Sequence, residues 1–291
     1  MIGLLICMAC AAAAMLAVGV RDAGRFVTVE YRFSCRGLKK KYRFVMLSDL
    51  HNKRFGAHNE RLLEKIDEYR PDGVLIAGDM VTSQVNADYG PAGELVEALA
   101  GKYPVYYANG NHEYRMKTES KRYGFGYDAY HRKLEDKGVV FLENGNVSLP
   151  EQGIRIFGVE IDRKYYGKLR RKPMSEDYLP ALLGKARPGE YTILLAHNPD
   201  YFPEYASWGA DLVLSGHVHG GIMRLPWLGG VLSPALRLFP EYDGGLFEKG
   251  KSRMVLGRGL GSHTIPLRFF NPGELIVVSL NPEAGGRNIR L

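Results

Sequence analysis

Cysteine is scarce in this sequence, and its positions exclude thiolate chemistry from most of the chain. Of 291 residues only three are cysteine, and these are Cys7, Cys10 and Cys35. The chain beyond residue 35 therefore offers no cysteine pair for a disulfide. A metal site in that region has to be built from His, Asp and Asn side chains.

Charged residues are absent from the first twenty positions. As a helix, Met1–Val20 would span about 30 Å, the thickness of the hydrocarbon core of a bilayer. No basic residue precedes this stretch, whereas a cleaved signal peptide normally begins with a basic region. Basic residues follow it, at Arg21, Arg25, Arg32, Arg36 and Lys39–Lys41. We expect residues 1–20 to form an uncleaved membrane anchor, with a cleaved signal peptide as the alternative, and the positive-inside rule places the following domain in the cytoplasm.

The sequence also contains no internal repeat. It contains no low-complexity segment beyond the Ala-rich N-terminus. Hydrophobic residues make up 45% of the chain and charged residues 24%, which is ordinary for a globular domain. The net charge of +7 favours anionic partners such as phosphates or acidic membrane surfaces, without selecting between them. We expect a juxtamembrane basic segment with a strand at 21–42, and one catalytic domain at 43–291.

Several short apolar runs have the length and composition of buried strands. They are Phe44–Leu47, Val74–Ala77, Pro104–Ala108, Tyr191–Ala196 and Asp211–Leu214. Helical patterns separate the first three, one beginning at the cap residue Asn59 and one covering Ala92–Ala100. This β-α-β-α-β order predicts a mainly parallel sheet with right-handed crossovers. A further strand is expected at Arg25–Phe33, where apolar and polar residues alternate.

Polar residues follow each of these five runs. They are Asp49 and His51, Asp79, Asn111, His197, and the pair His217 and His219. Sites in open α/β sheets form at the carboxyl ends of strands, so the fold would bring these side chains together. His217 and His219 are two residues apart and would point to the same side of an extended backbone. Seven such groups at five strand ends predict a metal centre, because caps and turn residues would not coincide so often.

The motifs in this order resemble those of the calcineurin-like metallophosphoesterases. The matching blocks are Asp49-x-His51, Gly78-Asp79, Gly110-Asn111-His112-Glu113, His197 and Gly216-His217-x-His219. Flanking segments are most similar to a bacterial, often membrane-anchored branch of that superfamily, and they include 47–52, 197–200, 224–226 and 257–261. This chain departs from the branch at Ile222, where Gln is usual, and at Gly273, which interrupts the usual Pro-Glu.

The resemblance implies a sandwich of two mixed β-sheets flanked by helices and a centre of two divalent metal ions, Mn, Fe or Zn. It assigns Asp79 as the bridging ligand. One site would be completed by Asp49, His51 and His219, and the other by Asn111, His197 and His217. Such ions clamp phosphoryl oxygens and acidify a bridging water, which attacks phosphorus. His112 would stabilise the transition state or protonate the leaving oxygen.

The implied substrate is a phosphate ester, and a phosphodiester or pyrophosphate at the membrane is expected, lipid-linked or nucleotide-linked. The alternatives are a UDP-2,3-diacylglucosamine pyrophosphohydrolase of lipid A synthesis, a nuclease-like relative and a metal-free scaffold. The chain lacks the length for a nuclease's extra domain, and every motif position is filled, which disfavours a scaffold. Nucleic acid is therefore not an expected partner, and the oligomeric state stays open.

Three further stretches have no assigned role. Segments 115–127 and 163–172 mix basic and aromatic residues, which suits either a grip on the substrate or a solvated or lipid-facing loop. Trp227, Leu228, Leu236, Leu238 and Phe239 form an apolar stretch after the histidine pair. That stretch fits the core, a lid or a lipid-facing lip.

Overall fold

The computed structural model describes residues 1–124, 126–167, 171–186, 189–221, 223–225, 229–231, 238–262 and 266–283. Phe125, Lys168 and Arg170 of the two basic-aromatic segments therefore lie outside the described residues. The same holds for Ile222 and for Trp227, Leu228 and Leu236 of the apolar stretch.

The first sheet contains six strands in the order β1-β14-β2-β3-β4-β5. Its strands are β1 (Phe26–Cys35), β14 (Gly273–Pro282), β2 (Tyr42–Leu47), β3 (Gly73–Ala77), β4 (Val105–Ala108) and β5 (Val140–Phe141). Strands β2, β3 and β4 run parallel, as the sequence predicts, β5 adds to β4 in the same sense, and β14 is antiparallel to β2. Strand β1 pairs in parallel with β14, so the strand predicted as a juxtamembrane segment forms an edge of this sheet.

The second sheet also has six strands, in the order β12-β13-β9-β8-β7-β6. They are β12 (Gly245–Lys249), β13 (Ser252–Leu256), β9 (Leu212–Ser215), β8 (Tyr191–Ala196), β7 (Ile154–Val159) and β6 (Gly145–Leu149). The four inner strands are parallel, and β12 and β6 pair with them in the antiparallel sense. A short hairpin, β10 (Arg224–Leu225) with β11 (Gly229–Gly230), stands apart from both sheets.

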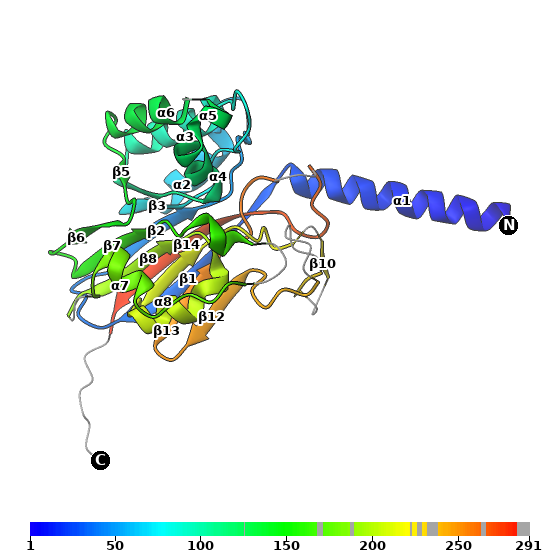
Figure 1. Ribbon diagram of the computed structural model, residues 1–291. Coiled ribbons are helices and arrows are strands. Elements are labelled where there is room, and N and C mark those ends of the chain that lie inside the picture. Colours follow the sequence, from blue (N-terminus) through cyan, green and yellow to red (C-terminus); the bar gives the residue numbers. More distant parts are fainter. Residues whose placement is uncertain are drawn as a thin grey trace, which may run out of the picture.

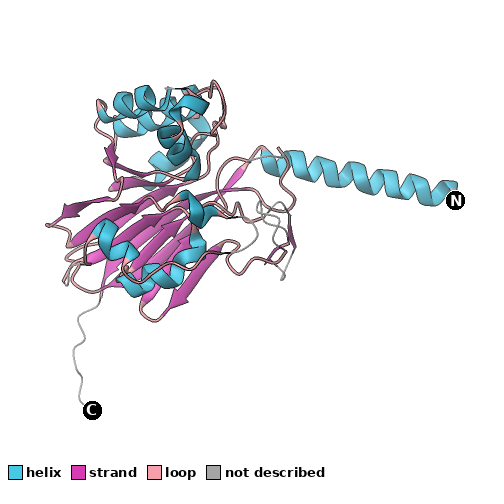
Figure 2. Cartoon of the chain, in the orientation of Figure 1, coloured by secondary structure: helices cyan, strands magenta, loops and turns pink. Residues whose placement is uncertain are grey.

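The sheets stack face to face, and helices cover their outer faces (Figures 1 and 2). One cluster of buried side chains lies between the sheets and includes Phe44, Ile193 and Leu214. A second cluster packs the first sheet against α2 (Glu60–Tyr69), α3 (Gly90–Ala100), α4 (Asn111–Thr118) and α6 (Gly126–Glu135). A third packs the second sheet against α7 (Tyr178–Leu183) and α8 (Phe202–Trp208). Short helices α5 (Ser120–Tyr123), η1 (Arg163–Tyr166) and η2 (Pro199–Tyr201) complete the described elements. The expected sandwich of two mixed sheets flanked by helices is confirmed.

Asn59 precedes α2 as expected, but it does not cap that helix through its side chain. Its Oδ1 accepts the N–H of Phe55 and its Nδ2 donates to the carbonyl of Pro91. The Glu60 carboxylate instead accepts the N–H groups of Ala57 and His58 ahead of the helix. Buried Asn59 therefore joins α2 to α3 instead of closing the helix end.

The chain begins with a long apolar helix, α1 (Ile2–Ala23), that projects away from the sandwich (Figure 1). The most apolar 18 residues of α1 have a mean hydropathy of 2.4 and 6% of them are buried, so the helix is long and apolar enough to cross a membrane. In its last turns, Gly19 and Asp22 are buried.

Candidate metal centre

The carboxyl ends of five strands converge at one edge of the sandwich. Asp49 and His51 follow β2, Asp79 follows β3, and Asn111 opens α4 directly after β4. His197 follows β8 in the second sheet, and His217 and His219 follow β9. Because β2, β3 and β4 are neighbours in one sheet and β8 and β9 in the other, parallel pairing sets all seven residues at the same edge.

Potential ligand atoms gather in three groups whose members lie within 4.8 Å of one another. The groups are Asp49, His51 and His219; His51, Asp79 and His112; and Asp79, His197 and His217. The first contains the three residues that the resemblance assigns to one metal site. His51 and Asp79 each belong to two of the groups, so the three groups form one connected cluster.

The separations between these atoms suit shared metal ions. His51 Nε2 lies 3.1 Å from His219 Nε2, and His219 Nε2 lies 3.3 Å from an oxygen of Asp49. His197 Nε2 lies 2.9 Å from Asp79 Oδ2. Ligand atoms about 2.0–2.2 Å from one ion are roughly 3.0–3.4 Å apart at octahedral to tetrahedral angles. The described residues are therefore close to the spacing that a metal centre needs.

The backbone at the site is strained. Asp49, His51, Asp79, His217 and His219 all have positive φ, between 49° and 77°. Non-glycine residues rarely adopt this left-handed region, and such strain collects at sites where geometry matters more than local stability. Five of the twelve non-glycine residues with positive φ in the described chain belong to this one cluster. Sharp turns at the strand ends thus aim the side chains at a common point.

Burial and opposite charge act against each other at the site. Burial raises the pKa of Asp49 to about 6, although the positive charge of His197 partly offsets it. Burial disfavours a charged His197, but attraction to Asp79 outweighs burial and raises its pKa to about 10. Burial also lowers the pKa of His217 to about 3, so its imidazole is neutral and can act as a ligand. The site therefore holds two buried carboxylates beside imidazoles, where divalent cations would take the place of the proton on His197.

Two buried oxygen atoms in the cluster have no hydrogen-bond partner within the described chain. They are Asp49 Oδ2 and Asn111 Oδ1. Leaving such atoms unsatisfied costs about 1–3 kcal/mol each. No lysine or arginine among the described residues forms an ion pair with Asp49 or Asp79. The donor set of carboxylate, amide and imidazole groups fits Mn, Fe or Zn ions.

Backbone carbonyls orient the imidazole rings from behind. His197 Nδ1 is 2.7 Å from the carbonyl oxygen of Ala77, to which its N–H donates, so Nε2 faces the site and is the nitrogen that a metal ion would bind in place of a proton. His219 Nδ1 faces the carbonyl of Gly261 at 3.3 Å in the same way. A hydrogen bond of this kind on the distal nitrogen is typical of metal-ligating histidines.

His112 is held in the opposite tautomer. Its Nδ1 accepts the backbone N–H of Ser83 at 2.8 Å, and the Ser83 hydroxyl lies at the same distance. A neutral His112 therefore carries its proton on Nε2, which lies 3.9 Å from Asp79 Oδ2. The backbone N–H of His112 also donates to Asp79 Oδ1 at 2.8 Å. Among the described histidines of the cluster, His112 thus offers the centre an N–H rather than a lone pair.

Glu113 is a structural residue to which the sequence pattern assigned no role. Its carboxylate is fully buried and accepts the N–H groups of Asp79, Met80 and Gly110 at 2.8–3.0 Å. Tyr107 donates to the same carboxylate. Glu113 therefore ties the ends of β3 and β4 together beneath the predicted ligands. The sequence signal for Glu113 is its position at the end of the Gly110-Asn111-His112-Glu113 block.

Parts of the two basic-aromatic segments reach the site. The Tyr166 ring, at the end of η1, lies 5.2 Å from the ring of His217. The charge of Arg115, on α4, contributes to the lowered pKa of His217, after burial and the charge of His197. In contrast, Lys117 pairs with Glu143 and Glu160 away from the centre.

Comparison with known proteins agrees with this geometry. The model of the family described as calcineurin-like phosphoesterase matches residues 42–221. The chain is 27% identical over 246 residues to the uncharacterized metallophosphoesterase YkuE of Bacillus subtilis, covering 82% of this chain and 79% of that protein. It is 27% identical over 226 residues to the phosphodiesterase YaeI of Escherichia coli, covering 76% of each. A transmembrane protein with metallophosphoesterase domain from Danio rerio is 29% identical over 249 residues, covering 82% of this chain and 53% of that protein.

Proposed function

The chain belongs to the calcineurin-like phosphoesterases and is a hydrolase of phosphoric ester bonds, and on this premise we propose that it is a binuclear-metal-dependent phosphodiesterase anchored to the membrane by α1. The observation that carries the proposal is the convergence of buried carboxylate, amide and imidazole atoms at five strand ends. Similarity to a protein named phosphodiesterase favours a diester or pyrophosphate substrate over a monoester.

In this proposal Asp49, His51 and His219 would hold one ion, Asn111, His197 and His217 would hold the other, and Asp79 would be shared between them. The ions would supply Lewis acidity that neutralises phosphoryl oxygens and acidifies a water molecule. The chain itself keeps the ligand atoms fixed: Ala77 and Gly261 orient two of the imidazoles through their carbonyl oxygens. The lone pairs therefore stay aimed at the centre without a search through rotamers.

His112 is the proposed catalytic residue. Because Ser83 donates to its Nδ1, the Nε2–H is presented to the mouth of the centre. An N–H in that position donates a hydrogen bond to a phosphoester oxygen and so stabilises the negative charge that develops on it in the transition state. His112 does not need to bind metal to do so.

Arg115 and Tyr166 are the proposed contacts to the rest of the substrate. The Arg115 guanidinium forms no ion pair within the described chain and lies near enough to influence the pKa of His217 and Tyr166. An arginine in that place would bind a phosphate oxygen. The Tyr166 ring, beside His217, would then pack against the alcohol portion of the ester.

Metal content and turnover test the proposal together. Purified full-length protein reconstituted with Mn, Fe, Co or Zn is assayed on bis-p-nitrophenyl phosphate, p-nitrophenyl phosphate and UDP-2,3-diacylglucosamine. We expect two metal equivalents and faster turnover of a diester or pyrophosphate than of the monoester. Asp79→Asn should lose both ions together and about 10²-fold or more of turnover, whereas His51→Ala should weaken one site more than the other.

Asp72→Asn is the matched control, because Asp72 lies at the opposite end of β3 and accepts the N–H of Arg43 through an oxygen that asparagine retains. That variant should keep both ions and full activity. An Asp79→Asn protein that holds two equivalents and turns over normally would refute the ligand assignment. Preference for UDP-2,3-diacylglucosamine over all other esters would identify the pyrophosphohydrolase alternative.

A further inference from the structure

Helix α1 is docked on the catalytic domain rather than joined to it by a free linker. The N–H of Arg268 donates to the carbonyl of Gly19 at 3.2 Å. A Cβ added at Gly19 would come within 2.7 Å of the Phe269 ring, so this ring lies directly against the helix backbone. Lys53 donates to the carbonyl of Ala23, and Asp22 is buried and paired with Arg25. These contacts fix the direction in which α1 leaves the domain.

The contact with Gly19 lies where the bilayer boundary should be. The uncharged stretch Ile2–Val20 spans roughly 28 Å at about 1.5 Å per residue, close to the roughly 30 Å of a hydrocarbon core. Arg21 and Asp22 are the first charged residues of the chain. The boundary therefore falls within about one helical turn of Gly19, and the segment 268–270 that touches Gly19 is held at the same level.

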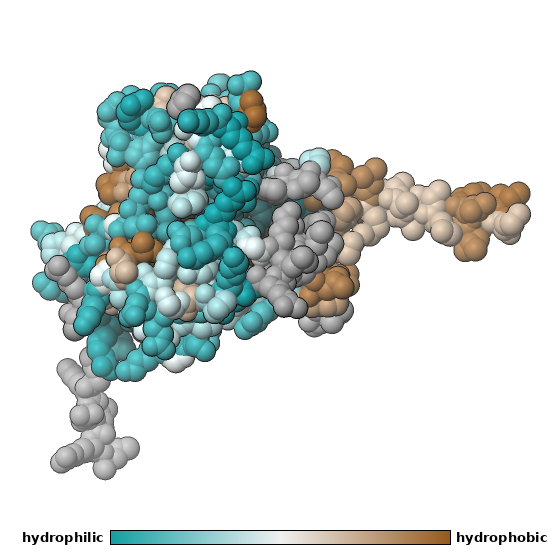
Figure 3. Space-filling view, in the orientation of Figure 1, coloured by the Kyte–Doolittle hydropathy of each residue, from teal (hydrophilic) through white to brown (hydrophobic). Residues whose placement is uncertain are grey.

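Apolar side chains are exposed at this level. Outside α1, the described large hydrophobic residues with exposed side chains are Val85, Val140, Leu225, Leu238, Phe239, Leu246 and Phe270. Four of these seven form what we term the apolar rim, with exposed fractions of 37% for Leu225, 68% for Leu238, 58% for Phe239 and 48% for Phe270. Figure 3 shows apolar surface on α1 and beside its base, on a largely hydrophilic face.

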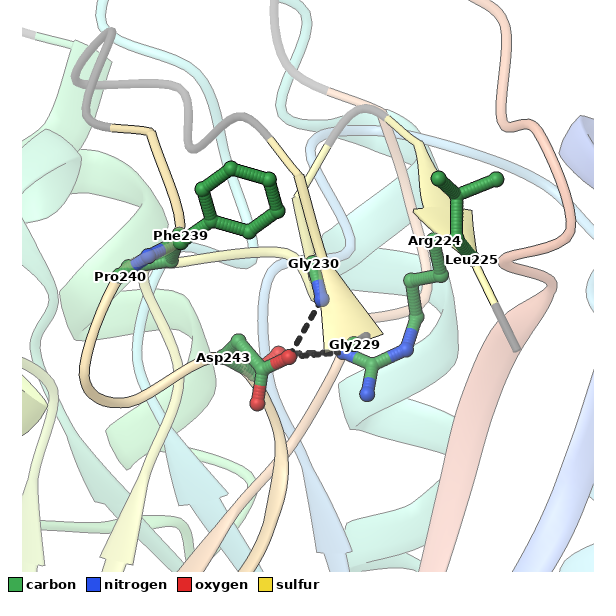
Figure 4. Close-up of a pocket in the computed structure, with 7 residues that line it drawn as sticks. All are labelled: Arg224, Leu225, Gly229, Gly230, Phe239, Pro240 and Asp243. Carbon is green, nitrogen blue, oxygen red and sulfur yellow. Dashed lines mark hydrogen bonds and ion pairs between the residues drawn. The ribbon is translucent and has the colours of Figure 1, made fainter. Parts of the chain in front are cut away.

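Backbone hydrogen bonds join the apolar rim to the base of α1. Arg224, next to Leu225, donates its N–H to the carbonyl of Phe269 at 3.0 Å. Val231 donates to Met223, and Phe239 donates to Val231, at 2.9 and 3.0 Å. Leu225 and Phe239 both line one pocket of about 450 Å³, which the Arg224–Asp243 ion pair also lines (Figure 4). The rim is therefore one connected surface.

Two rim residues are held in strained conformations. Phe239 and Phe270 have φ values of 47° and 54°. Bulky residues avoid this region, and strain of this kind persists where the surroundings enforce it. Both side chains are nevertheless exposed, so each turn presents an aromatic ring outward from the rim.

The apolar rim is also continuous with the candidate metal centre. Asn271, beside Phe270, donates to the carbonyls of His219 and Gly221 at 2.8 and 2.7 Å. Arg224 donates to the carbonyl of Gly220. Leu225 and Phe270 thus each lie next to a residue that holds the second histidine motif in place.

We propose that the apolar rim inserts into the surface of the lipid bilayer beside α1 and holds the mouth of the metal centre at the level of the lipid headgroups. Continuity with the apolar helix selects the bilayer as the partner, because the rim and the end of α1 form one surface at one depth. If the proposed phosphodiesterase function also holds, the substrate class is an amphiphile whose phosphodiester lies at the headgroup level.

Depth measurements test the insertion without any assay of activity. Full-length protein with Cys7 and Cys10 changed to serine is given one new cysteine, by Phe239→Cys or Phe270→Cys, and labelled with an environment-sensitive fluorophore. Cys35 is kept, because it is buried and burial raises its thiol pKa to about 11, so it does not compete for the label. The labelled proteins are placed in nanodiscs of phosphatidylethanolamine and phosphatidylglycerol, with and without lipids spin-labelled near the top of the acyl chain.

Val140→Cys is the matched control, because Val140 is an exposed apolar residue on β5, on the side of the molecule away from α1 (Figure 1). We expect labels at 239 and 270 to emit at shorter wavelength and to be quenched at least twofold more than the label at 140. Equal, weak quenching at all three positions would overturn the proposal. Agreement between 239 and 270 guards against a local effect of either substitution.

Paired substrates test the consequence for catalysis. p-Nitrophenyl hexadecyl phosphate partitions into the nanodisc, whereas p-nitrophenyl methyl phosphate stays in water, and both release p-nitrophenolate when water adds to phosphorus. We expect wild type to favour the hexadecyl ester at least tenfold, and Phe239→Ser/Phe270→Ser to lose that preference while retaining turnover of the methyl ester. A preference that survives in the double variant would count against the rim. Hydrolysis of neither ester would refute the proposed function, while the depth measurement would still decide the insertion.

Discussion

His112 depends on a residue that lies outside every motif block. Ser83 fixes the proton of His112 on Nε2 by donating its backbone N–H to Nδ1. A backbone donor cannot be removed by an ordinary side-chain change, so this tautomer is robust to mutation at position 83. The Nε2–H can donate a hydrogen bond to a substrate, whereas a scaffold that only binds metal does not need such a donor.

We predict that His112→Asn binds metal normally but loses turnover on esters with poor leaving groups. Loss of one hydrogen-bond donor to the developing charge typically costs about 10²–10³-fold in rate, or roughly 2.7–4 kcal/mol of barrier. Activated aryl esters, whose leaving oxygen carries less charge, should suffer less. Turnover of wild type and variant across a leaving-group series, with metal content measured in parallel, checks this. Equal losses across the series would show that the donor does not act on the leaving oxygen, and no loss at all would remove His112 from the mechanism.

At the scale of elements, Glu113 joins two strand ends to the start of α4. Its carboxylate serves at least three backbone N–H groups and a tyrosine hydroxyl in a fully buried position. Burial raises its pKa to about 7, and the nearby charge of Asp79 acts in the same direction. The donors around it compensate that burial, so replacing the carboxylate leaves some of them unsatisfied.

We therefore predict that Glu113→Gln lowers the free energy of unfolding by about 2–4 kcal/mol, because the amide has one acceptor oxygen instead of two. Guanidinium unfolding of the metal-free, detergent-solubilised protein measures the change. Glu64→Gln, on the exposed face of α2, is the control and should change the free energy of unfolding by less than about 0.5 kcal/mol. A Glu113→Gln protein as stable as that control would show that the strand ends do not need this carboxylate.

The edge pairing of β1 with β14 is sensitive to acid. The hydrogen bond from Arg32 lowers the pKa of Glu30 from 4.5 to about 2, and Ser279 on β14 also donates to this carboxylate. A lowered pKa means that the folded state favours the ionised group. The stabilisation is therefore complete above pH 4.5 and is lost as the pH falls from 4.5 toward 2.

Glu30→Gln should accordingly cost about 0.5–1 kcal/mol near neutral pH and nothing near pH 2, since Arg32 is largely exposed and the ion pair is screened by solvent. Unfolding curves of wild type and variant between pH 2 and 7 give the difference. A double-mutant cycle with Arg32→Gln assigns the effect to the pair. A difference that stays constant with pH would contradict the prediction.

Strand and helix patterns predicted the part of the molecule that local sequence controls. The runs that became β2, β3, β4, β8 and β9 are short, apolar and followed by polar residues, so parallel pairing brought the predicted ligands to one edge. The partners of β1 and the supporting roles of Ser83, Arg268 and Asn271 were not predictable in this way. Each of them depends on a contact between residues far apart in the chain, for which spacing carries no signal. The positive φ angles at the ligands are likewise set by tertiary packing.

For the molecule as a whole, folding separates charges that are adjacent in the sequence. Strand β1 carries the chain away from α1 by about 3.3 Å per residue, or roughly 30 Å over its length. The Lys39–Lys41 cluster follows its far end, whereas Arg21 and Arg25 stay beside the helix. These basic residues can therefore act together on the orientation of α1 in the membrane only while the chain is being inserted, before β1 pairs with β14.

We predict that α1 is retained in the mature protein and that the catalytic domain faces the cytoplasm. The basic residues all follow the apolar stretch, which orients that end inward during insertion. Contacts of Arg268 with Gly19 and of Lys53 with Ala23 then lock the end of the helix to the folded domain.

Intact mass of the membrane-extracted protein from a bacterial host should include residues 2–23, and protease should digest the domain in inverted vesicles but not in intact spheroplasts. Digestion after detergent treatment controls for intrinsic resistance. A mature N-terminus at residue 12 or later, or digestion from outside intact spheroplasts, would overturn the topology while leaving the metal centre untouched.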